Sequence, residues 1–502
     1  MVPTKEESEQ TPVLANKEAR LETDLSWIYL TDSHAYKVKK PLKINGRDYS
    51  TLALREKACQ REARLNARFA TAAKLDVLPL FGEPEHWSFS GVGEPTEFCI
   101  RMPRLPADHM LDQLLGERPL EADELKRLAD ALASFYQSAK TSEKISRAGA
   151  PSAIEANLRA NLKALEDLEP PILVVDCIES AQLEFIAVHQ DLLEKRVQNG
   201  KIRDGHGELI AAHLCMTPQP VALGCAEYSD RARQKDILED LALLLVDLEL
   251  MGHKPLADSL WIELAQRLGE KVDEPLLDFY KSMAACSHAR HEALFPAGIE
   301  RARKLAEIAR VYCKKFHRAR VFVTVGLLGA GKSTLSQALA QTLGMKRISA
   351  QDVYSRKFAS QDKKARPIRL CAVKIDQLYD EMCSEAKDFL LDEISVIMDA
   401  DFHTRPHRAK VSSMAAELGV PCLFLECRIS KNEIIARLDR RRKKDRTMAR
   451  IQPELYDDHK ERYEPLDELT PQVVLSLNTS QPVPSLVDSV IETLKKATPP
   501  GE

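Results

Sequence analysis

The sequence lacks the features that mark secreted, disulfide-stabilised and membrane-spanning proteins. Its 502 residues include eleven cysteines, but these are scattered, with no C-x-x-C pair and no spacing typical of metal ligands. The N-terminal segment MVPTKEESEQTP is polar and has no apolar signal region. No apolar run is long enough to cross a bilayer. We therefore expect reduced thiols in a cytoplasmic protein.

A strong charge excess, internal repeats and low-complexity tracts are missing as well. The net charge of −4 is small for this length, so there is no bulk electrostatic reason to expect nucleic acid or a membrane as a partner. The apolar content of 44% is ordinary for a globular protein. A chain of this length is too long to fold around a single hydrophobic core, which indicates two or three domains.

One stretch carries a motif with a defined chemistry. Residues 321–335 read VFVTVGLLGAGKSTL, which is a strand-like run, a G-x-x-x-x-G-K-[ST] loop and the start of a helix. The loop comprises Gly326, Leu327, Leu328, Gly329, Ala330, Gly331, Lys332, Ser333 and Thr334. The alternative, a glycine-rich turn that binds nothing, does not need this spacing or the Lys-Ser pair. The motif in this context therefore predicts a phosphate-binding loop.

Each residue type in this loop has a chemical reason. The three glycines permit backbone conformations that a Cβ forbids, so that N–H groups can point at phosphate oxygens. The N-terminus of the following helix adds partial positive charge. Lys332 can reach the β- and γ-phosphates of a nucleotide, and the Ser333 hydroxyl can ligate Mg²⁺. We therefore expect ATP and Mg²⁺ as cofactors.

The pattern after Lys332 predicts an α/β doubly wound domain with a parallel sheet, because strands alternate with helices. The candidate strands are 321–325, 347–349, 394–398, 422–426 and 473–477. Sheets of this kind bind ligands at the carboxyl ends of their strands. Upstream, a strand-rich segment precedes a region that is mostly helical from residue 119 to about 315.

Two acids follow candidate strands of this sheet. Asp352 comes after the second strand, and Asp399 follows the third, in the run Asp399-Ala400-Asp401. A strand-end acid can hold Mg²⁺ or take a proton from an attacking hydroxyl, although a single Asp at such a place is commonly a helix cap. We favour Asp352 as the general base on an acceptor hydroxyl and Asp399 as the magnesium-side acid. The reverse assignment stays open.

The most basic run of the chain lies where a lid would close over the phosphates. In RLDRRRKK, from residue 437, Arg437 and Arg441 are four residues apart and share a helix face. Guanidinium groups there would stabilise the charge of a transferred phosphoryl group. A solvated helix face and a nucleic-acid contact are the alternatives. We favour the lid arginines.

Residues 321–401 resemble the small P-loop kinases that include zeta-toxin-like and polynucleotide-kinase-like domains. The resemblance rests on GLLGAGKSTL, on Asp352, on MDADF at 398–402 and on ARLDRRR at 436–442. It implies that Asp352 handles the acceptor hydroxyl and that Arg437 and Arg441 are paired lid arginines.

The upstream half resembles the aminoglycoside-phosphotransferase-like kinases. This resemblance rests on AYKVKKP from residue 35, REARLN from 61, RMPR from 101 and DGHGELIAAH from 204. Together the halves resemble a bacterial bifunctional aminoglycoside phosphotransferase/ATP-binding protein family. The polar residues 1–20 look like a disordered or loosely attached leader, and the strand–helix pattern places a P-loop domain at 316–498. Between them, the resemblance implies an α+β protein-kinase-like domain at 21–315 with a strand-rich and a helical lobe. Lys37 would then pair with ATP phosphates, and Glu62 would hold Lys37.

The upstream half departs from that kinase pattern where the base and the metal ligands are expected. The catalytic His-Gly-Asp reads His206-Gly-Glu208, and a shift of about 1 Å in a reacting group can cost around a hundredfold in rate. His213 stands where an Asn ligand is usual, and Gly224 stands where an Asp ligand is expected. We interpret this domain as degenerate, with weak or no activity. An active kinase with a rearranged metal site and a different alignment are the alternatives.

Two functions agree with these observations. In the first, the P-loop domain transfers the γ-phosphoryl group of ATP to a hydroxyl of a small-molecule or nucleotide-like acceptor. In the second, it binds or slowly hydrolyses ATP as a switch, and the upstream domain is a ligand sensor or docking platform. The sequence identifies neither the acceptor nor the oligomeric state, because fold alone does not establish a substrate.

Overall fold

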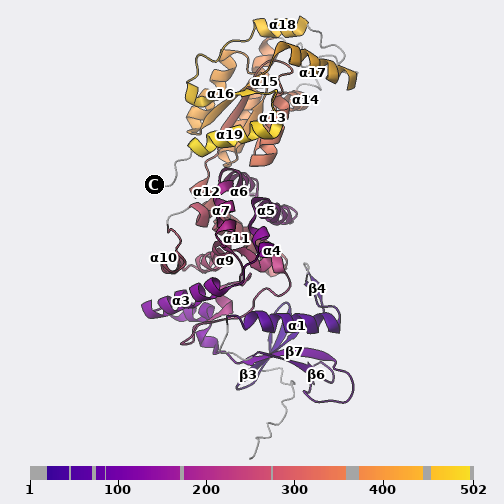
Figure 1. Cartoon of the computed structure of the whole chain (residues 1–502), viewed down its shortest axis with the longest axis vertical. Coiled ribbons are helices and arrows are strands. Elements are labelled where there is room, and N and C mark those ends of the chain that lie inside the picture. The colour runs from indigo at the N-terminus through magenta and orange to yellow at the C-terminus, as the bar shows by residue number, and fades with distance from the viewer. Residues whose placement is uncertain are drawn as a thin grey trace, which may run out of the picture. The chain divides into compact units, whose positions relative to one another are not determined.

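The chain forms two compact units, each built from two segments. The computed structural model describes residues 20–44, 47–69, 75–84, 86–169, 175–272, 275–357, 372–444 and 454–497. The first unit comprises Met1–Ala150 with Glu194–Asp273, and the second comprises Pro151–Leu193 with Glu274–Glu502. Residues 151–193 and 274–315, which we predicted to belong to the upstream domain, thus group with the P-loop region. Figure 1 labels the elements of both units.

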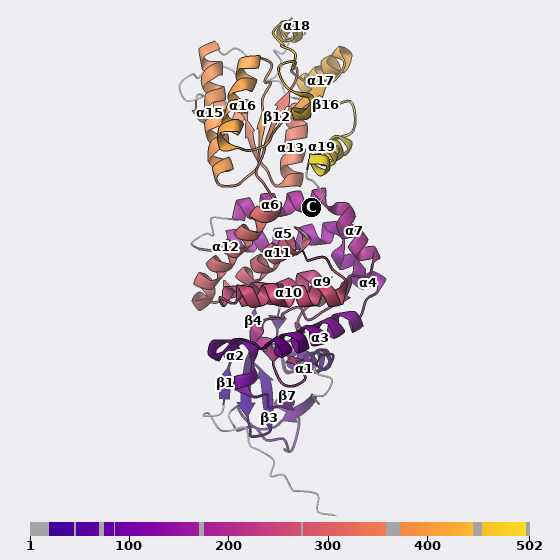
Figure 2. The same cartoon turned by 90° about the vertical axis from the view of Figure 1, so that its left-hand side faces the viewer.

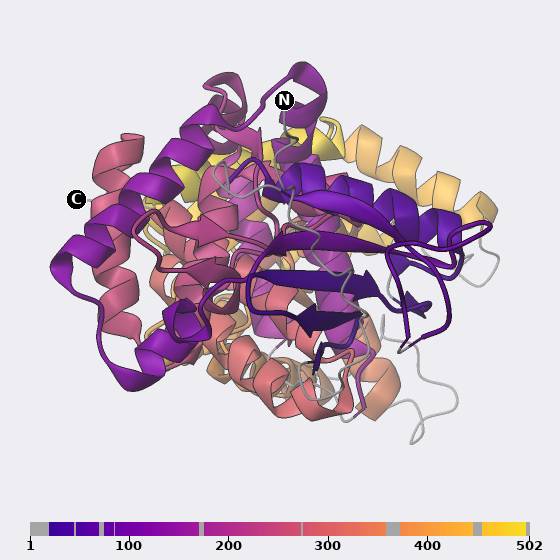
Figure 3. The same ribbon diagram turned by 90° about the horizontal axis from the view of Figure 1, so that it is seen from below.

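A five-stranded antiparallel sheet begins the first unit, with strand order β1-β2-β3-β7-β6. Its strands, indigo to purple in Figure 3, are β1 (Arg20–Glu22), β2 (Ser26–Leu30), β3 (His34–Lys39), β6 (Asp76–Leu80) and β7 (Glu97–Pro103). Helix α1 (Leu52–Asn66) begins at Thr51, whose hydroxyl accepts a hydrogen bond from the Leu54 N–H at 3.3 Å. Its Cys59 and Ala63 pack on Ile100 of the sheet.

Helices and short strand pairs complete the first unit. The helices are α2 (Leu111–Glu117), α3 (Ala122–Ser138), α4 (Glu143–Ser146), α8 (Asp230–Arg233), α9 (Ile237–Leu250) and α10 (Lys254–Leu268), while α7 (Gln190–Gln198) crosses the boundary between the units. The short strands are β4 (Lys43–Ile44) with β5 (Arg47–Asp48), β8 (Ile202–Asp204) with β11 (Gln234–Asp236), and β9 (Leu214–Cys215) with β10 (Val221–Ala222). The unit therefore has a strand-rich part and a helical part, and its protein-kinase-like assignment stays a prediction.

The second unit contains a five-stranded sheet of order β13-β14-β12-β15-β16, and every pairing in it is parallel. The strands are β12 (Val321–Val325), β13 (Lys346–Ser349), β14 (Val396–Asp399), β15 (Cys422–Arg428) and β16 (Val474–Asn478). All five residues of β12 are buried, as expected for a central parallel strand covered on both faces. The predicted α/β domain with its parallel sheet is confirmed.

Helices cover both faces of this sheet (Figure 2). On one face α13 (Lys332–Leu343) and α19 (Val483–Ala497) pack on Phe322. On the other, α15 (Ala372–Leu391) and α16 (Arg405–Leu418) pack on Val323. The remaining helices of the unit are α5 (Pro151–Glu166), α6 (Val175–Val188), α11 (Pro275–Glu292), α12 (Ile299–Phe316), α14 (Ala350–Lys357), α17 (Lys431–Lys444) and α18 (Glu454–Glu461).

Two sequence expectations concern thiols and membranes. The ten cysteines within the described part of the chain are all free, and Cys371 lies outside it. Among the described residues, no helix combines the length and the apolar character needed to pass through a membrane.

Candidate functional site

The predicted phosphate loop lies between β12 and α13 and has the backbone that its glycines were expected to provide. The φ angles of Gly326, Gly329 and Gly331 are 150°, 82° and 95°. Residues that carry a Cβ rarely adopt φ values in this range. A Cβ on Gly331 would lie 3.0 Å from Arg437 Nη1, and one on Gly329 would lie 3.2 Å from the Leu438 side chain. The loop thus forms a cradle that added side-chain atoms would fill.

Lys332 is buried at the start of α13 and is held by oxygen atoms. Its Nζ donates to the carbonyl oxygens of Gly326 and Leu327, both at 2.9 Å, and forms an ion pair with Asp401 Oδ1 at 2.7 Å. Phosphate oxygens can substitute for such partners, because they offer the ammonium group the same hydrogen bonds and more negative charge. The site therefore fits a nucleotide phosphate.

Ser333 of the loop lies next to Asp399 of the neighbouring strand. Asp399, at the end of β14, is buried, and its Oδ1 accepts a hydrogen bond from Ser333 Oγ at 3.3 Å. Its Oδ2 is bound by Arg347 of β13, whose Nε also donates to Ser336 Oγ at 2.9 Å. A hydroxyl and a carboxylate at this separation are oxygen ligands that suit Mg²⁺. The predicted pair is thus brought together.

Asp352 lies in the first turn of α14, where its carboxylate is 60% exposed. Its Oδ2 is 3.8 Å from Arg347 Nη1, and the same guanidinium binds Asp399. Arg347 thus connects the two acids that we assigned to acceptor and metal. The exposed carboxylate is accessible to an acceptor molecule at this edge of the sheet.

A third acid and two histidines extend the site. Asp401 Oδ2 lies 3.1 Å from His459 Nε2 on α18, and the rings of His459 and His403 are 4.8 Å apart. Burial disfavours the charged carboxylate, but Lys332 and His459 outweigh it and hold the pKa of Asp401 well below its usual range. Burial lowers the pKa of His403 to about 4, so its imidazole is neutral near pH 7.

The predicted lid arginines lie on α17. Arg437 Nη2 donates to the Thr479 carbonyl at 2.5 Å, and Thr479 Oγ1 donates to the Ala330 carbonyl of the loop at 2.6 Å. Arg437 is therefore placed beside the phosphate loop. The Arg441 side chain lies outside the described residues. Arg408, in the first turn of α16, is fully buried and binds Glu468 at 2.5 Å, which is a structural role.

In the first unit, Lys37 and Glu62 form the predicted ion pair, with Lys37 Nζ 2.7 Å from Glu62 Oε1. A second lysine, Lys39, lies 2.7 Å from Glu62 Oε2 and 2.6 Å from Glu227 Oε1. Tyr49 donates its hydroxyl to the same Glu227 oxygen at 2.5 Å. Burial opposes ionisation of Glu62, but the two lysines outweigh it and lower its pKa to about 2.

The other predicted residues of this unit are engaged with protein groups. Arg47 binds the Glu208 carboxylate. His213 Nδ1 lies 2.6 Å from the Glu208 carbonyl oxygen, and His206 Nε2 lies 3.1 Å from the Leu223 carbonyl oxygen. A Cβ on Gly224 would lie 2.8 Å from His213 Nε2, so the His213 ring fills the space that a longer residue at 224 would need.

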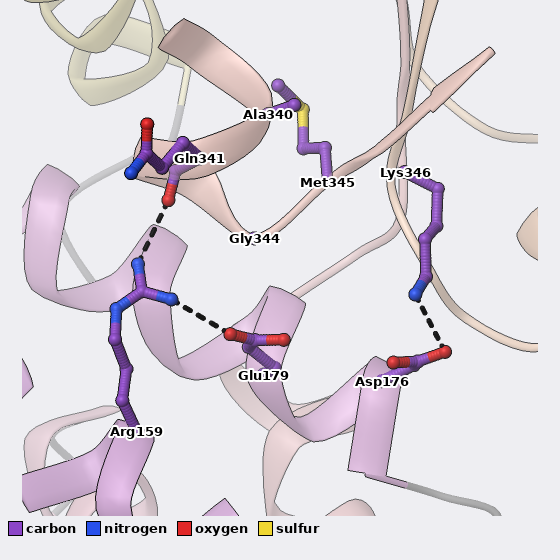
Figure 4. Close-up of a pocket in the computed structure, with 8 residues that line it drawn as sticks. All are labelled: Arg159, Asp176, Glu179, Ala340, Gln341, Gly344, Met345 and Lys346. Carbon is purple, nitrogen blue, oxygen red and sulfur yellow. Dashed lines mark hydrogen bonds and ion pairs between the residues drawn. The ribbon is translucent and has the colours of Figure 1, made fainter. Parts of the chain in front are cut away.

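A pocket of about 150 Å³ lies at the far end of α13 from the phosphate loop (Figure 4). Arg159 binds Glu179 and the Gln341 carbonyl oxygen, both at 2.9 Å, and Lys346 binds Asp176 at 2.9 Å. The charged side chains that line this pocket are therefore paired with one another, and the pocket contains no residue of the predicted site.

Sequence reasoning missed Arg347, His403, His459 and Lys39 as members of these clusters. Lys39 had a signal, because residues two apart in a strand share a face, which places it beside Lys37. The contact of Arg347 with Asp399 depends on the register of β13 against β14, in which Ser349 pairs with Asp399. His459 is far from Asp401 in the chain, and no local pattern connects them.

Comparison with known families supports the prediction of a P-loop domain in the C-terminal region. Residues 321–466 match a family model described as an AAA domain. The match covers the phosphate loop, the strand-end acids and α17. The C-terminal region is thus a P-loop domain of the nucleotide-binding kind.

Individual proteins that are similar to this chain add little about activity. Uncharacterized proteins of Mycobacterium tuberculosis and Mycobacterium bovis are 28% identical over 431 residues, which is 81% of this chain and 82% of each relative. A sugar kinase from Janibacter sp. HTCC2649 (18% identity, TM-score 0.29) aligns with 35% of this chain and 94% of its own length. A gluconokinase from Sinorhizobium meliloti 1021 (17% identity, TM-score 0.28) aligns with 36% and 94%. We draw no functional conclusion from structural likeness at this level.

Proposed function

We propose that the C-terminal domain is an ATP-dependent phosphotransferase that moves the γ-phosphoryl group to a hydroxyl of a small-molecule or nucleotide-like acceptor. The observation that carries the proposal is the cluster at the carboxyl edge of the sheet. There Ser333 Oγ lies 3.3 Å from Asp399 Oδ1, and Arg347 bridges Asp399 to the exposed carboxylate of Asp352. A nucleotide site and a base for an acceptor thus share one edge.

The residues of this edge divide the chemistry between them. Lys332 would move from Asp401 onto the β- and γ-phosphates, and Arg437 would stabilise charge on the transferred group. Ser333 and Asp399 would hold Mg²⁺, which when bound neutralises phosphate charge. Asp352 would take the proton of the acceptor hydroxyl while that oxygen attacks phosphorus and the bond to ADP breaks.

The upstream unit, in this proposal, is a kinase-like domain with weak or no activity. Lys39 sits between Glu62 and Glu227, and Arg47 binds Glu208. These cations occupy the acidic groups that would otherwise hold a metal ion or act as a base. The unit would then serve as a ligand sensor or docking platform.

A transfer assay tests the proposal. Radiolabelled γ-phosphate from ATP–Mg²⁺ is followed into pools of metabolites, aminoglycosides and 5′-hydroxyl oligonucleotides. We expect a labelled product that Lys332→Ala abolishes, and that Asp352→Asn reduces by about 10²–10⁴-fold, the usual worth of a general base. The matched control is Glu381→Gln, a half-exposed acid of α15 that pairs with Lys357 at 3.1 Å.

The second candidate is an ATPase switch. The place of Asp352 in the first turn of α14 favours it, because a carboxylate there is stabilised by the partial positive charge of the helix N-terminus without any acceptor. A switch should consume ATP at one rate whatever acceptor is present, and Asp352→Asn should leave that rate unchanged. Transfer or ATPase activity that persists in Lys332→Ala would contradict both the transferase and the switch hypothesis for the P-loop domain. Comparison with Lys37→Ala assigns the activity to one unit.

A further inference from the structure

A cluster of one carboxylate and two imidazoles lies beside the phosphate loop, and the proposed function gives the two imidazoles no role. One ligand atom each from Asp401, His403 and His459 lies within 4.8 Å of the others. We propose that these three residues bind a first-row transition-metal dication of the Zn²⁺ type, at a site separate from that of Ser333 and Asp399. The inference does not depend on the transferase activity.

The separation of two of these ligand atoms suits a shared ion. Asp401 Oδ2 and His459 Nε2 lie 3.1 Å apart. Ligand atoms bound to one tetrahedral zinc ion at 2.0–2.2 Å are about 3.3 Å from each other. Two imidazoles with a carboxylate make a ligand set that favours zinc and its neighbours over Mg²⁺, which prefers oxygen ligands. Three protein ligands leave a fourth position open.

Both histidines keep a ring nitrogen available. His403 Nδ1 and His459 Nδ1 are buried and have no hydrogen-bond partner among the described residues. Buried polar atoms are paired in nearly all native proteins, so an unpaired one points to a missing ligand. His403 Nδ1 can serve as a ligand atom of the proposed ion. His459 would bind through Nε2, the nitrogen that lies 3.1 Å from Asp401 Oδ2, so its Nδ1 is outside the ligand set.

The backbone holds the first two ligands in place. Phe402, between them, has φ of 45°, a conformation that costs a bulky residue free energy, and its ring is fully buried. Hydrogen bonds fix the segment on both sides: Gly326 N–H donates to the Asp401 carbonyl at 3.2 Å, and Glu464 N–H donates to the His403 carbonyl at 2.9 Å. Strain held by such contacts is typical of preorganised sites.

Lys332 does not block this site, because it contacts the other carboxylate oxygen. Its Nζ lies 2.7 Å from Asp401 Oδ1, whereas His459 lies next to Oδ2. A metal ion on Oδ2 and the ammonium group on Oδ1 would share one carboxylate. Removing the Lys332 charge should therefore retain or tighten metal binding, which is the opposite of its effect on nucleotide binding.

Metal titration of the full chain tests the proposal. After metal removal, Zn²⁺ is added and the bound metal is measured by elemental analysis and calorimetry. We expect one tightly bound equivalent, weakened about 100-fold or more in His403→Ala and in His459→Ala. Ser333→Ala, which removes the proposed magnesium ligand, and His86→Ala, which removes an exposed histidine, should bind like the wild type.

A second measurement avoids reliance on variants that fail to fold. In the wild type, bound Zn²⁺ should protect His403 and His459, and no exposed histidine, from acylation mapped by mass spectrometry. Co²⁺ used as a probe should show visible ligand-field bands without the thiolate charge-transfer band that cysteine ligation would add. An apoprotein that binds no zinc, equal zinc content in both alanine variants, or protection of other histidines would each overturn the proposal.

Discussion

Two buried lysines show how the same residue type is left open to a ligand in one unit and closed off in the other. Lys332 has one carboxylate partner, Asp401, and two carbonyl oxygens. Lys39 lies between the carboxylates of Glu62 and Glu227, and its side chain is 3% exposed. Phosphate can replace the partners of Lys332 at little cost. Displacing Lys39 would leave buried Glu227 with the Tyr49 hydroxyl but without its lysine partner, and a buried charge that loses its ion-pair partner costs several kcal/mol.

His206 provides a pH dependence in the first unit. It is 2% exposed, and burial, with a smaller effect of His213, lowers its pKa from 6.5 to about 3. The folded state therefore favours the neutral ring, so the stabilisation is complete above pH 6.5 and is lost as the pH falls towards 3. We expect the titration of this group alone to lower the free energy of unfolding by about 2 kcal/mol when the pH falls from 7 to 5.

Urea denaturation at several pH values checks this expectation. His206→Gln, which cannot titrate, should flatten the fall in the stability of the first unit between pH 7 and pH 5. His86→Gln, at an exposed position, should reproduce the wild-type slope. An unchanged slope in His206→Gln would show that other groups cause the acid sensitivity.

At the scale of elements, the phosphate loop depends on α17. Gly331, with φ of 95°, directly precedes helix α13, and a Cβ there would lie 3.0 Å from Arg437 Nη1. Gly331→Ala should therefore destabilise the second unit by about 1–2 kcal/mol through backbone strain. It should also displace Arg437 from Thr479 and lower the affinity for nucleotide.

Thermal unfolding and nucleotide titration measure the two effects. Gly116→Ala is the matched control, because this glycine lies within helix α2 and a Cβ there would have open space. Alanine at that position should be neutral or stabilising by up to about 1 kcal/mol. If Gly331→Ala had the same effect on stability and nucleotide affinity as Gly116→Ala, the close contact between α17 and the phosphate loop would be contradicted.

Sequence patterns predicted the elements better than the contacts among them. The strand–loop–helix unit at 321–343 was predicted because its signals are local: buried β-branched residues, three glycines and a Lys-Ser pair. The bridge from Arg347 to Asp399 was not, because it depends on which strands are neighbours in the sheet. The same limit applies to Asp401 and His459, which no periodicity connects.

At the scale of the whole molecule, the chain carries one site open to phosphate and one whose charges are matched internally. The predicted domain boundary at residue 316 separates the two signals in sequence, but the second unit also includes α5, α6, α11 and α12. Val188 of α6 packs in the same core as Leu339 of α13. The helix that follows the phosphate loop thus packs against a segment that precedes it by more than a hundred positions in the sequence.

This arrangement predicts that nucleotide acts on one unit only. A ligand at 100 times its Kd stabilises the state that binds it by about 2.7 kcal/mol. In hydrogen exchange with ATP and Mg²⁺, we therefore expect slower exchange in β12, α13 and the segment after β14, because phosphate would hold Lys332 and Ser333. Peptides that contain Lys37, Glu62 and Glu227 should exchange at the rate of the free protein.

Two variants separate the units in the same experiment. Lys332→Ala should abolish the protection of the second unit, whereas Lys37→Ala should leave it intact. Protection of the Lys37 and Glu62 peptides that disappears in Lys37→Ala would mean that nucleotide reaches the first unit despite Lys39. The upstream domain would then have to be regarded as a second nucleotide site rather than a degenerate one.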